Sequence, residues 1–230
     1  MKTTVLIPTY NEKDNIGEVL AGVKKQGVDE ILVVDGYSTD GTRELVVKLG
    51  YTPVLQEGKG LGEAIKTGIK RASGDIIIIV DADGSHAVSD INKLTAKINE
   101  GYDLVVASRY ISGPRLKGLF RRQSSSYDDT FIRELGNRMF TWMARTFYGV
   151  PAHDILMGFK AFRRSIFEKV VLIETGQQFD AEIMIKAQKA GYKITEIPTI
   201  EYKRKSGESK LSVPYHGFKV LWVIIRELFT

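Results

Sequence analysis

Short apolar runs alternate along the first half of the chain with longer segments in which apolar residues recur at helical spacing. This alternation is typical of a parallel sheet whose strands are connected by helices. The expected strands span residues 4–8, 30–35, 52–56, 75–83 and 103–108. The expected helices span residues 11–25, 63–72 and 89–99, with one further helix ending near residue 48. The pattern therefore predicts an α/β fold with a mostly parallel central sheet flanked by helices.

The segment 75–83, DIIIIVDAD, carries the strongest strand signal in the chain. Its five consecutive apolar residues, Ile76–Val80, are typical of a strand that is covered on both faces. We therefore expect this strand near the centre of the sheet. If the chain stays extended beyond it, the side chains of Asp81 and Asp83 point to the same side, because residues two apart in a strand share a face.

The pattern changes after residue 109. Residues 112–130 are rich in Ser, Gly and Arg, show no clean period and are expected to form a long loop. A helix is expected over 131–149, followed by a strand over 159–164, a helix over 179–191 and a strand over 193–200. Since no linker or repeat interrupts the chain, we expect residues 1–212 to form one domain.

A final helix is expected over residues 213–230. Apolar residues follow one stripe of this helix: Phe218, Leu221, Trp222, Ile225, Leu228 and Phe229. A stripe of this width either packs on the domain or lies in a membrane interface, and the sequence leaves both possibilities open.

The composition is that of an ordinary globular protein, with 43% hydrophobic and 27% charged residues in 230. No apolar run approaches the roughly 20 residues of a membrane-spanning helix. The N-terminus does not resemble a signal peptide. The chain has no cysteine, which excludes disulfides and thiolate metal sites. We therefore expect a cytoplasmic location.

The net charge of +5 is concentrated in one block of the chain. Between Arg109 and Arg145 there are eight basic and three acidic residues. Such a block predicts a contact surface for a phosphate, a lipid headgroup layer or a nucleic acid, and a solvated basic face is the alternative. Because few aromatic residues are interleaved and no binding motif is present, nucleic acid is not expected as a partner.

Chemically useful residues follow four of the expected strands, where ligands bind in an open parallel sheet. They are Pro8, Tyr10, Glu12, Asp35, Lys59, Asp81 and Asp83. Mg²⁺ or Mn²⁺ is commonly held by one or two carboxylates together with substrate phosphates, so Asp81 and Asp83 are candidate metal ligands. A turn is the alternative, because Asp and Gly are common in turns. His86 either contacts a bound diphosphate or an acceptor, or only caps the loop.

Several motifs together carry a resemblance to a known family. They are IPTYNE at 7–12, VVDGYSTDGT at 33–42, GKGLGEAIKTGI at 58–69, VDADGSH at 80–86, ASRY at 107–110, GFKAFRR at 158–164, FDAEI at 179–183 and GESKL at 207–211. The chain resembles the family 2 inverting glycosyltransferases of the GT-A, nucleotide-diphospho-sugar-binding fold, and among them the dolichol-phosphate mannose synthase-like group. The resemblance covers nearly the whole chain.

The resemblance implies a role for each candidate residue. Residues 1–108 would bind a nucleotide sugar and residues 109–212 the acceptor, with 213–230 as an amphipathic helix. Pro8, Tyr10, Glu12, Asp35 and Lys59 would border the nucleotide, and Asp81 and Asp83 would hold Mg²⁺ or Mn²⁺ on the diphosphate. The acceptor phosphate and the leaving diphosphate would be met by Arg109, Arg133, Arg204 and Lys210. Asp83, Arg109 and Arg204 are the expected catalytic residues.

The implied reaction is transfer of a hexosyl or N-acetylhexosaminyl group to dolichyl or polyprenyl phosphate. It implies peripheral contact with the cytoplasmic face of a membrane, and a membrane partner subunit is possible. The chain departs from the mannosyl enzymes at Ser85, where they usually have glutamine, and in its DGYSTDGT and LMGFK segments. The donor is therefore open between GDP-mannose and a UDP-sugar.

Other functions stay open at the level of sequence. A soluble saccharide or protein acceptor would use the same donor site. Nucleotidyl transfer usually needs a glycine-rich loop after the first strand. Here the first glycine after this strand is Gly17, which argues against that activity. A non-catalytic nucleotide-binding protein is excluded only by activity.

Overall fold

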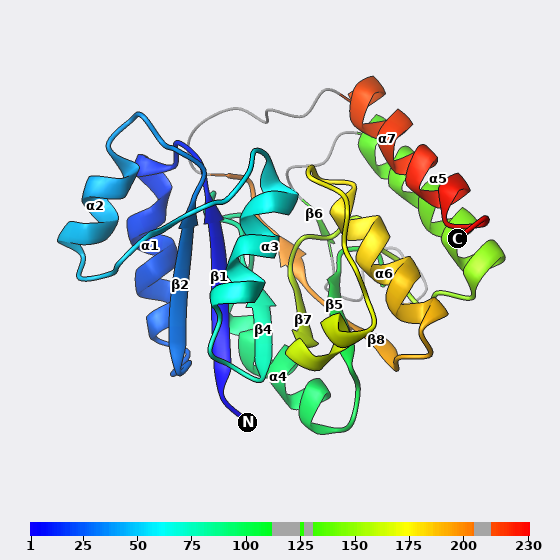
Figure 1. The fold of residues 1–230 in the computed structure, drawn as a ribbon, viewed down its shortest axis with the longest axis horizontal. Helices are drawn as coiled ribbons and strands as arrows, with labels where there is room; N and C mark the ends of the chain where they lie inside the picture. Colours follow the sequence, from blue (N-terminus) through cyan, green and yellow to red (C-terminus); the bar gives the residue numbers. More distant parts are fainter. Residues whose placement is uncertain (112–124, 127–130, 205–212) are drawn as a thin grey trace, which may run out of the picture.

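The structure is a computed structural model that describes residues 1–111, 125–126, 131–204 and 213–230. In these ranges seven strands form one sheet in the order β3-β2-β1-β4-β7-β5-β8, and β6 and β9 form a separate pair (Figure 1). The strands are β1 (Thr3–Thr9), β2 (Glu30–Asp35), β3 (Val54–Leu55), β4 (Ile76–Ile79), β5 (Leu104–Ser108), β6 (Ser125–Ser126), β7 (Lys160–Arg163), β8 (Ile194–Pro198) and β9 (Ile200–Glu201). All pairings in the large sheet are parallel except those of β7, which confirms the predicted mostly parallel sheet.

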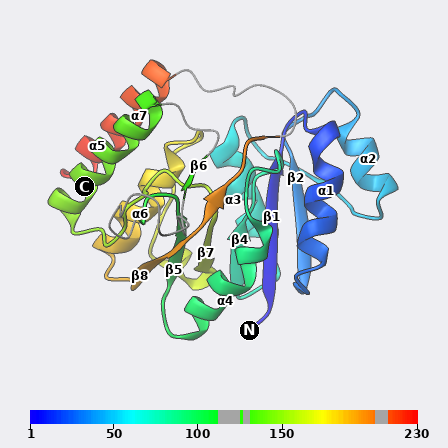
Figure 2. The ribbon, with the colours of Figure 1, turned by 180° about the vertical axis from the view of Figure 1, so that it is seen from behind.

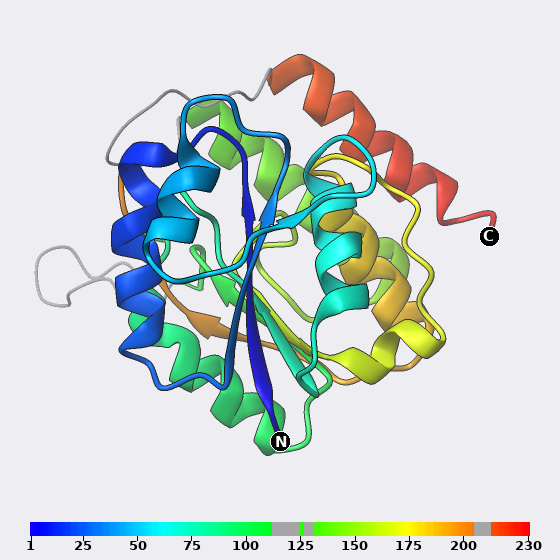
Figure 3. The same cartoon turned by 60° about the vertical axis from the view of Figure 1, so that its left-hand side comes forward.

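Helices cover both faces of the large sheet, which is the middle of three layers (Figure 3). The α-helices are α1 (Lys13–Lys24), α2 (Thr42–Lys48), α3 (Leu61–Arg71), α4 (Ile91–Asn99), α5 (Phe131–Tyr148), α6 (Phe179–Lys189) and α7 (Val213–Arg226). α1 and α4 cover one face, and α3 and α6 cover the other. In α1 the apolar positions predicted from helical spacing, Ile16, Val19, Leu20 and Val23, are all buried.

Strand β4 lies at the centre of the sheet, between β1 and β7, as its apolar run predicted. Its four isoleucines are at most 1% exposed. The strand ends at Ile79, however, and the chain turns at Ala82 and Asp83 instead of staying extended. On one side β7 begins at Lys160, directly opposite Ile79, and on the other side the last bond to β1 runs from the backbone N–H of Val80 to the carbonyl of Leu6 at 3.0 Å. The two aspartates thus reach the edge of the sheet on a turn, not as alternate residues of a strand.

Strand β7 runs against its two neighbours, β4 and β5. Its first residues therefore lie at the edge where the parallel strands end. Lys160 pairs with Ile79 of β4 and with Val106 of β5. Because β7 is antiparallel, its first residue lies at the same edge of the sheet as the last residues of the parallel strands.

Helix α7 packs against α5 and α6 at one end of the molecule (Figures 1 and 2). Val220, Val223 and Ile224 are buried in this contact. The opposite side of α7 is exposed at Tyr215, Phe218, Trp222 and Ile225, and Leu228 and Phe229, which follow the helix, are exposed as well. The helix therefore packs on the domain and still presents an apolar face. No helix within the described part of the chain is long and apolar enough to cross a membrane.

Candidate active site at the carboxyl edge of the sheet

Asp35, the last residue of β2, is buried with one carboxylate oxygen lacking a partner. Its Oδ2 accepts a hydrogen bond of 2.9 Å from the backbone N–H of Ser38. Its Oδ1 is buried, and none of the described residues donates to it. Because an unsatisfied buried acceptor is unfavourable, such an atom in a native protein needs an explanation. A ligand N–H or O–H would complete it, which fits the predicted contact with a nucleotide base or ribose.

The predicted site residues at the end of β1 and just after it have different environments. Pro8 lies within the buried strand, whereas the ring of Tyr10 is 50% exposed at the edge. Glu12 instead supports the start of α1. Its carboxylate accepts from the side-chain amide of Asn15 at 2.7 Å, and its backbone N–H donates to the hydroxyl of Thr42 at 2.9 Å. The predicted nucleotide contact of Glu12 stays a prediction.

Lys59 is exposed on the loop between β3 and α3. Hydrogen bonds of Gln56 fix the part of this loop that precedes Lys59. The side-chain amide of Gln56 donates to the carbonyl of Gly58 at 2.6 Å, and the hydroxyl of Tyr37 donates to the carbonyl of Gln56 at 3.0 Å. The backbone N–H of Gln56 in turn donates to the carbonyl of Asp35 at 3.1 Å. These bonds attach the Lys59 loop to the end of β2.

The two aspartates of the 81–83 turn are held by residues that follow them in the chain, and Asp83 also by Arg204. The backbone N–H of Asp81 donates to Nδ1 of the buried His86 at 3.1 Å, and His86 stacks on Phe159 with ring centroids 4.9 Å apart. Asp83 accepts from the backbone N–H of Ser85 at 2.9 Å, and its other oxygen lies 3.3 Å from Arg204. His86 therefore supports the turn, and Arg204 lies beside the acidic pair.

Burial raises the pKa of the Asp81 carboxyl to about 6, and the negative charges of Asp83, Asp180 and Glu201 add to this effect against the opposing influence of His86. A carboxylate that ionises with difficulty among like charges is stabilised by a bound cation. In the described ranges no group of three or more acidic or histidine side chains is arranged to hold a metal ion by itself. The donor set therefore fits a metal that also takes ligands from a substrate diphosphate.

Arg109, which follows β5, is buried in an ion-pair network. Its guanidinium donates to both oxygens of Asp154, at 2.7 and 3.0 Å, and to Glu201 at 3.1 Å. Asp154 is fully buried and also accepts from Asn137 of α5 at 2.6 Å. Although burial lowers the pKa of Arg109, these carboxylates hold it well above its usual value. Asp154, which sequence reasoning did not single out as its partner, fixes the orientation of this guanidinium.

The other predicted basic residues are only partly placed. Arg204 follows β9, which is joined to the aspartate turn because the backbone N–H of Tyr202 donates to the carbonyl of Ser85 at 2.8 Å. Arg133 is half-buried on α5. Lys210 lies outside the described residues, and so does much of the basic block between residues 109 and 145. The acceptor roles of Arg133 and Lys210 therefore stay predictions.

A buried ion pair that the sequence motifs did not reveal lies behind the acidic turn. Lys160, at the start of β7, is fully buried and lies 2.5 Å from Asp180 at the start of α6. Burial raises the pKa of Asp180, and Lys160 opposes that shift. The motifs GFKAFRR and FDAEI each contribute one partner. The opposite charges of these two motifs are the signal in the sequence that could have predicted the pair.

The chain is similar in sequence to curated proteins over most of its length. The chain is 32% identical to glycosyltransferase AglJ of Haloferax volcanii, over 88% of this chain and 64% of that protein. It is also 32% identical to the dolichyl-phosphate hexose transferase of the same organism, over 93% of this chain and 87% of that protein. The chain therefore spans somewhat less than two thirds of the length of AglJ.

Among solved structures, glucosyl-3-phosphoglycerate synthase from Mycobacterium tuberculosis, in complex with Mn²⁺, UDP-glucose and phosphoglyceric acid, matches with a TM-score of 0.76. The match covers 99% of this chain and 79% of that one at 21% identity, so it shows the fold. This fold is the GT-A fold that the sequence predicted. Residues 4–171 match the sequence pattern of glycosyl transferase family 2. The chain belongs to that family.

Proposed function

We propose that the protein is a metal-dependent inverting glycosyltransferase that moves a hexosyl or N-acetylhexosaminyl group from a nucleotide-diphospho-sugar to dolichyl or another polyprenyl phosphate. The observation that carries this proposal is the Asp81–Asp83 turn, in which a carboxylate of raised pKa lies among like charges and an arginine lies beside the pair. The unpartnered Asp35 oxygen supports a nucleotide at the same edge. The dolichyl-phosphate hexose transferase among the relatives supports the acceptor.

Asp81 and Asp83 would hold Mg²⁺ or Mn²⁺ against the donor diphosphate. When bound, the metal would stabilise the charge on the departing nucleoside diphosphate. Asp35, Tyr10 and Lys59 would bind and orient the nucleotide. Arg204, 3.3 Å from Asp83, lies where it would add positive charge beside the leaving group.

The nucleophile would be an oxygen of the acceptor phosphate. The second pKa of a phosphate monoester is about 6, so this group is mainly a dianion at neutral pH and needs positioning more than deprotonation. Its lone pair would form the new bond to the anomeric carbon while the bond to the donor diphosphate breaks, and the electron pair leaves with the diphosphate. Attack from the opposite face inverts the anomeric centre. Arg109, held in orientation by Asp154, would steady the acceptor.

Donor and acceptor can be assigned by one pair of measurements. The full chain with Mn²⁺ is expected to show a thermal shift with either GDP-mannose or a UDP-sugar, and chelation by EDTA should remove most of that shift. The stabilising donor is then incubated with a short polyprenyl phosphate. A lipid-linked sugar is the expected product. Transfer to soluble sugars or proteins, with none to the lipid, would contradict the acceptor assignment.

Membrane contact belongs to the same proposal, and the exposed apolar residues of α5 and α7 support it. On α5 these are Phe131, Ile132, Leu135, Met139, Trp142 and Phe147, and at the C-terminus they are the four exposed residues of α7 together with Leu228 and Phe229 just after it. The two helices pack side by side (Figure 1). An exposed apolar surface of this kind typically marks an interaction site. Because the acceptor is a lipid, we propose that this surface lies in the membrane interface.

The chain's two tryptophans, Trp142 and Trp222, lie on α5 and α7 and are 62% and 56% exposed, so they report on this contact. When vesicles that contain anionic lipid are added, the tryptophan fluorescence of the protein is expected to shift to shorter wavelength. Phe218→Glu should weaken vesicle binding about tenfold or more, because a buried phenylalanine contributes about 1.5–3 kcal/mol. Val47→Glu, on an exposed position of α2 at the other end of the molecule, is the control (Figure 1). Equal binding by both variants would exclude this surface.

A further inference from the structure

Residues 172–178, here called the strap, pass over the start of α3. The backbone N–H of Gly62 donates to the carbonyl of Thr175 at 2.8 Å. A Cβ atom at Gly60 would lie 2.4 Å from the Thr175 carbonyl oxygen, and one at Gly62 would lie 2.4 Å from the Glu174 carbonyl oxygen. Real Cβ atoms do not approach backbone oxygens so closely. Two glycines of the GKGLG motif are therefore required by the strap.

The side chain of Glu182, on α6, binds the backbone of the strap. This side chain is fully buried, and its carboxylate accepts from the backbone N–H groups of Ile173 and Glu174 at 3.1 and 3.0 Å. The side chain of Glu174 accepts from Gln178 at 2.6 Å. Hydrogen bonds to a buried charged group are stronger than those between neutral groups, so this end of the strap is firmly attached to α6.

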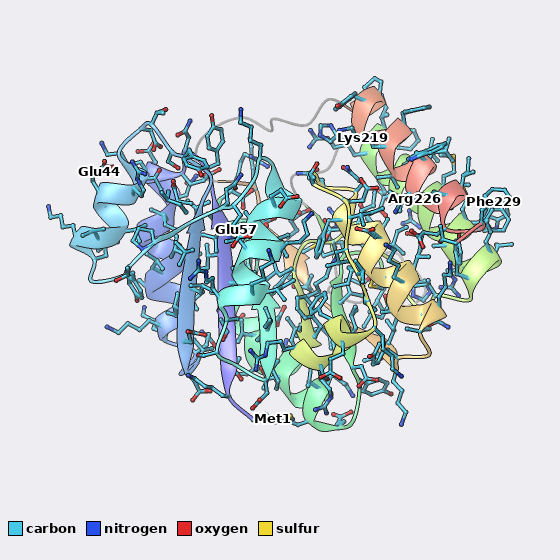
Figure 4. All side chains as sticks on the ribbon, viewed as in Figure 1. Met1, Glu44, Glu57, Lys219, Arg226 and Phe229 are labelled. Atoms are coloured by element: carbon cyan, nitrogen blue, oxygen red, sulfur yellow. The ribbon has the colours of Figure 1, made fainter. Side chains whose placement is uncertain are left out.

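Arg226, in the last turn of α7, joins the C-terminal helix to this assembly. Its guanidinium pairs with Glu174 of the strap, with Glu182 at 3.3 Å and with Glu227 at 2.8 Å. Figure 4 shows Arg226 where α7 meets α6. One arginine thus connects the helix that carries the exposed apolar surface, the strap and the buried carboxylate that holds the strap.

The strap contacts the residues that follow Lys59, whereas Gln56 contacts the residue before it. Gly60, the residue after Lys59, has a φ of +100° and lies against the carbonyl of Thr175. Gln56 donates to the carbonyl of Gly58, the residue before Lys59. The exposed lysine is therefore carried by a short loop with a fixed contact on each side. One of these contacts leads through Thr175 and Glu174 to Arg226.

We propose that Arg226 is a positioning residue for donor binding: through Glu174 and the strap it fixes the loop that carries Lys59. The inference rests on the proposed function, in which Lys59 contacts the nucleotide. A loop that is already ordered loses less conformational entropy when the ligand binds. Loss of the Arg226 contacts therefore weakens donor binding and leaves the acceptor phosphate contacts in place.

The test compares Arg226→Ala, Lys59→Ala and the double variant in the full chain. Binding of UDP-glucose and of GDP-mannose with Mn²⁺ is measured by calorimetry, and steady-state kinetics are measured with a short polyprenyl phosphate. Arg226→Ala should raise the donor Kd and KM about fivefold, a typical size for coupling between two sites. The kcat at saturating donor and the acceptor KM should stay close to wild type. Since Arg226 acts through Lys59, the double variant should lose no more donor affinity than Lys59→Ala alone.

Two further variants separate positioning from general stability. Gly62→Ala forces the strap away from α3 without touching Arg226, and it should reproduce the donor-specific loss even if Arg226→Ala folds poorly. Arg163→Ala is the matched control, because Arg163 is also partly buried, lies 3.6 Å from Asp103 and donates to two backbone carbonyls, but it lies at the amino end of the sheet. Its donor KM should not change.

The outcomes for the proposed function and for this inference are distinct. If wild-type protein binds neither nucleotide sugar, the proposed function is wrong and the inference falls with it. If wild type binds a donor but the losses of Arg226→Ala and Lys59→Ala add in full, Arg226 does not act through Lys59. Equal losses in donor KM, acceptor KM and kcat, or a matching loss in Arg163→Ala, would likewise overturn the positioning role.

Discussion

Asp83→Asn is expected to abolish glycosyl transfer while the chain stays folded. Asparagine can still accept the hydrogen bond from the backbone N–H of Ser85, so the turn is retained. The negative charge beside Arg204 is lost, and with it one of the two proposed metal ligands. Removal of a group that stabilises transition-state charge typically lowers kcat by about 100-fold or more. Turnover and Mn²⁺-dependent nucleotide binding should both fall.

Asp103→Asn is the matched control for this variant. Asp103 also accepts a hydrogen bond from a backbone N–H, that of Lys193 at 2.8 Å, and lies 3.6 Å from an arginine, Arg163. It precedes β5 and is therefore at the opposite edge of the sheet. Activity close to wild type is expected in this control. Normal metal affinity in Asp83→Asn would mean that the acidic pair is only a turn.

Asp81→Asn is expected to be equally inactive and, without metal, more stable than wild type at neutral pH. The pKa of Asp81 is raised to about 6 in the folded protein from 3.8, so folding disfavours its ionised form. The destabilisation is absent below the unfolded pKa of 3.8, grows as the pH rises from there to about 6, and is fully present above that pH. Thermal unfolding in EDTA should therefore show a gain in Tm for the variant at pH 7–8 that vanishes near pH 4. A lower Tm at all pH values would contradict this electrostatic assignment.

The second large effect is expected at Arg109, where function and stability change together. Arg109→Gln removes the charge that faces the fully buried Asp154 and the partly buried Glu201. Breaking a buried ion pair by removing one partner typically costs about 3–5 kcal/mol of folding free energy. The variant should unfold at a lower denaturant concentration and lose acceptor use more than donor binding.

The double variant Arg109→Gln, Asp154→Asn separates the two effects. Two amides can hydrogen-bond to one another, and Asn137 of α5 remains available to the new side chain at Asp154. A large part of the lost stability should return, whereas acceptor use should stay low because the positive charge is still missing. Recovery of both would show that Arg109 contributes through the fold alone. A loss confined to donor KM in the double variant would place Arg109 on the donor side.

The alternation of apolar runs and helical segments was sufficient to predict the sheet and most of its elements. The buried stretch Ile76–Ile79 and the buried face of α1 follow directly from their periodicity. The pattern predicted the ends of strands less well, because strand length depends on the pairing partners. β3 is only Val54–Leu55, shorter than the predicted 52–56, and β4 stops before the aspartates. A strand extends only as far as its neighbours offer hydrogen-bonding groups, and the neighbours are set by the tertiary fold.

The candidate site divides in the same manner. Residues at the ends of parallel strands, such as Asp35 and the Asp81–Asp83 pair, can be predicted because a parallel sheet collects strand ends at one edge. The buried pair Lys160–Asp180 depends on the reversed direction of β7, which no local pattern signals. The support of Arg109 by Asp154 joins residues 45 apart in the chain.

The C-terminal helix shows what each level of information determines. Its amphipathic spacing left packing on the domain and membrane contact both open. The structure shows Val223 and Ile224 packed on the domain and Phe229 exposed at the end of the chain (Figure 4). By itself the sequence determined the kind of protein, because its motifs together resemble one family and its periodicity predicts the sheet at whose edge most of them lie. Only the tertiary structure decided which charges neutralise one another and which glycines admit the strap, because these depend on distances between segments that are remote in the chain.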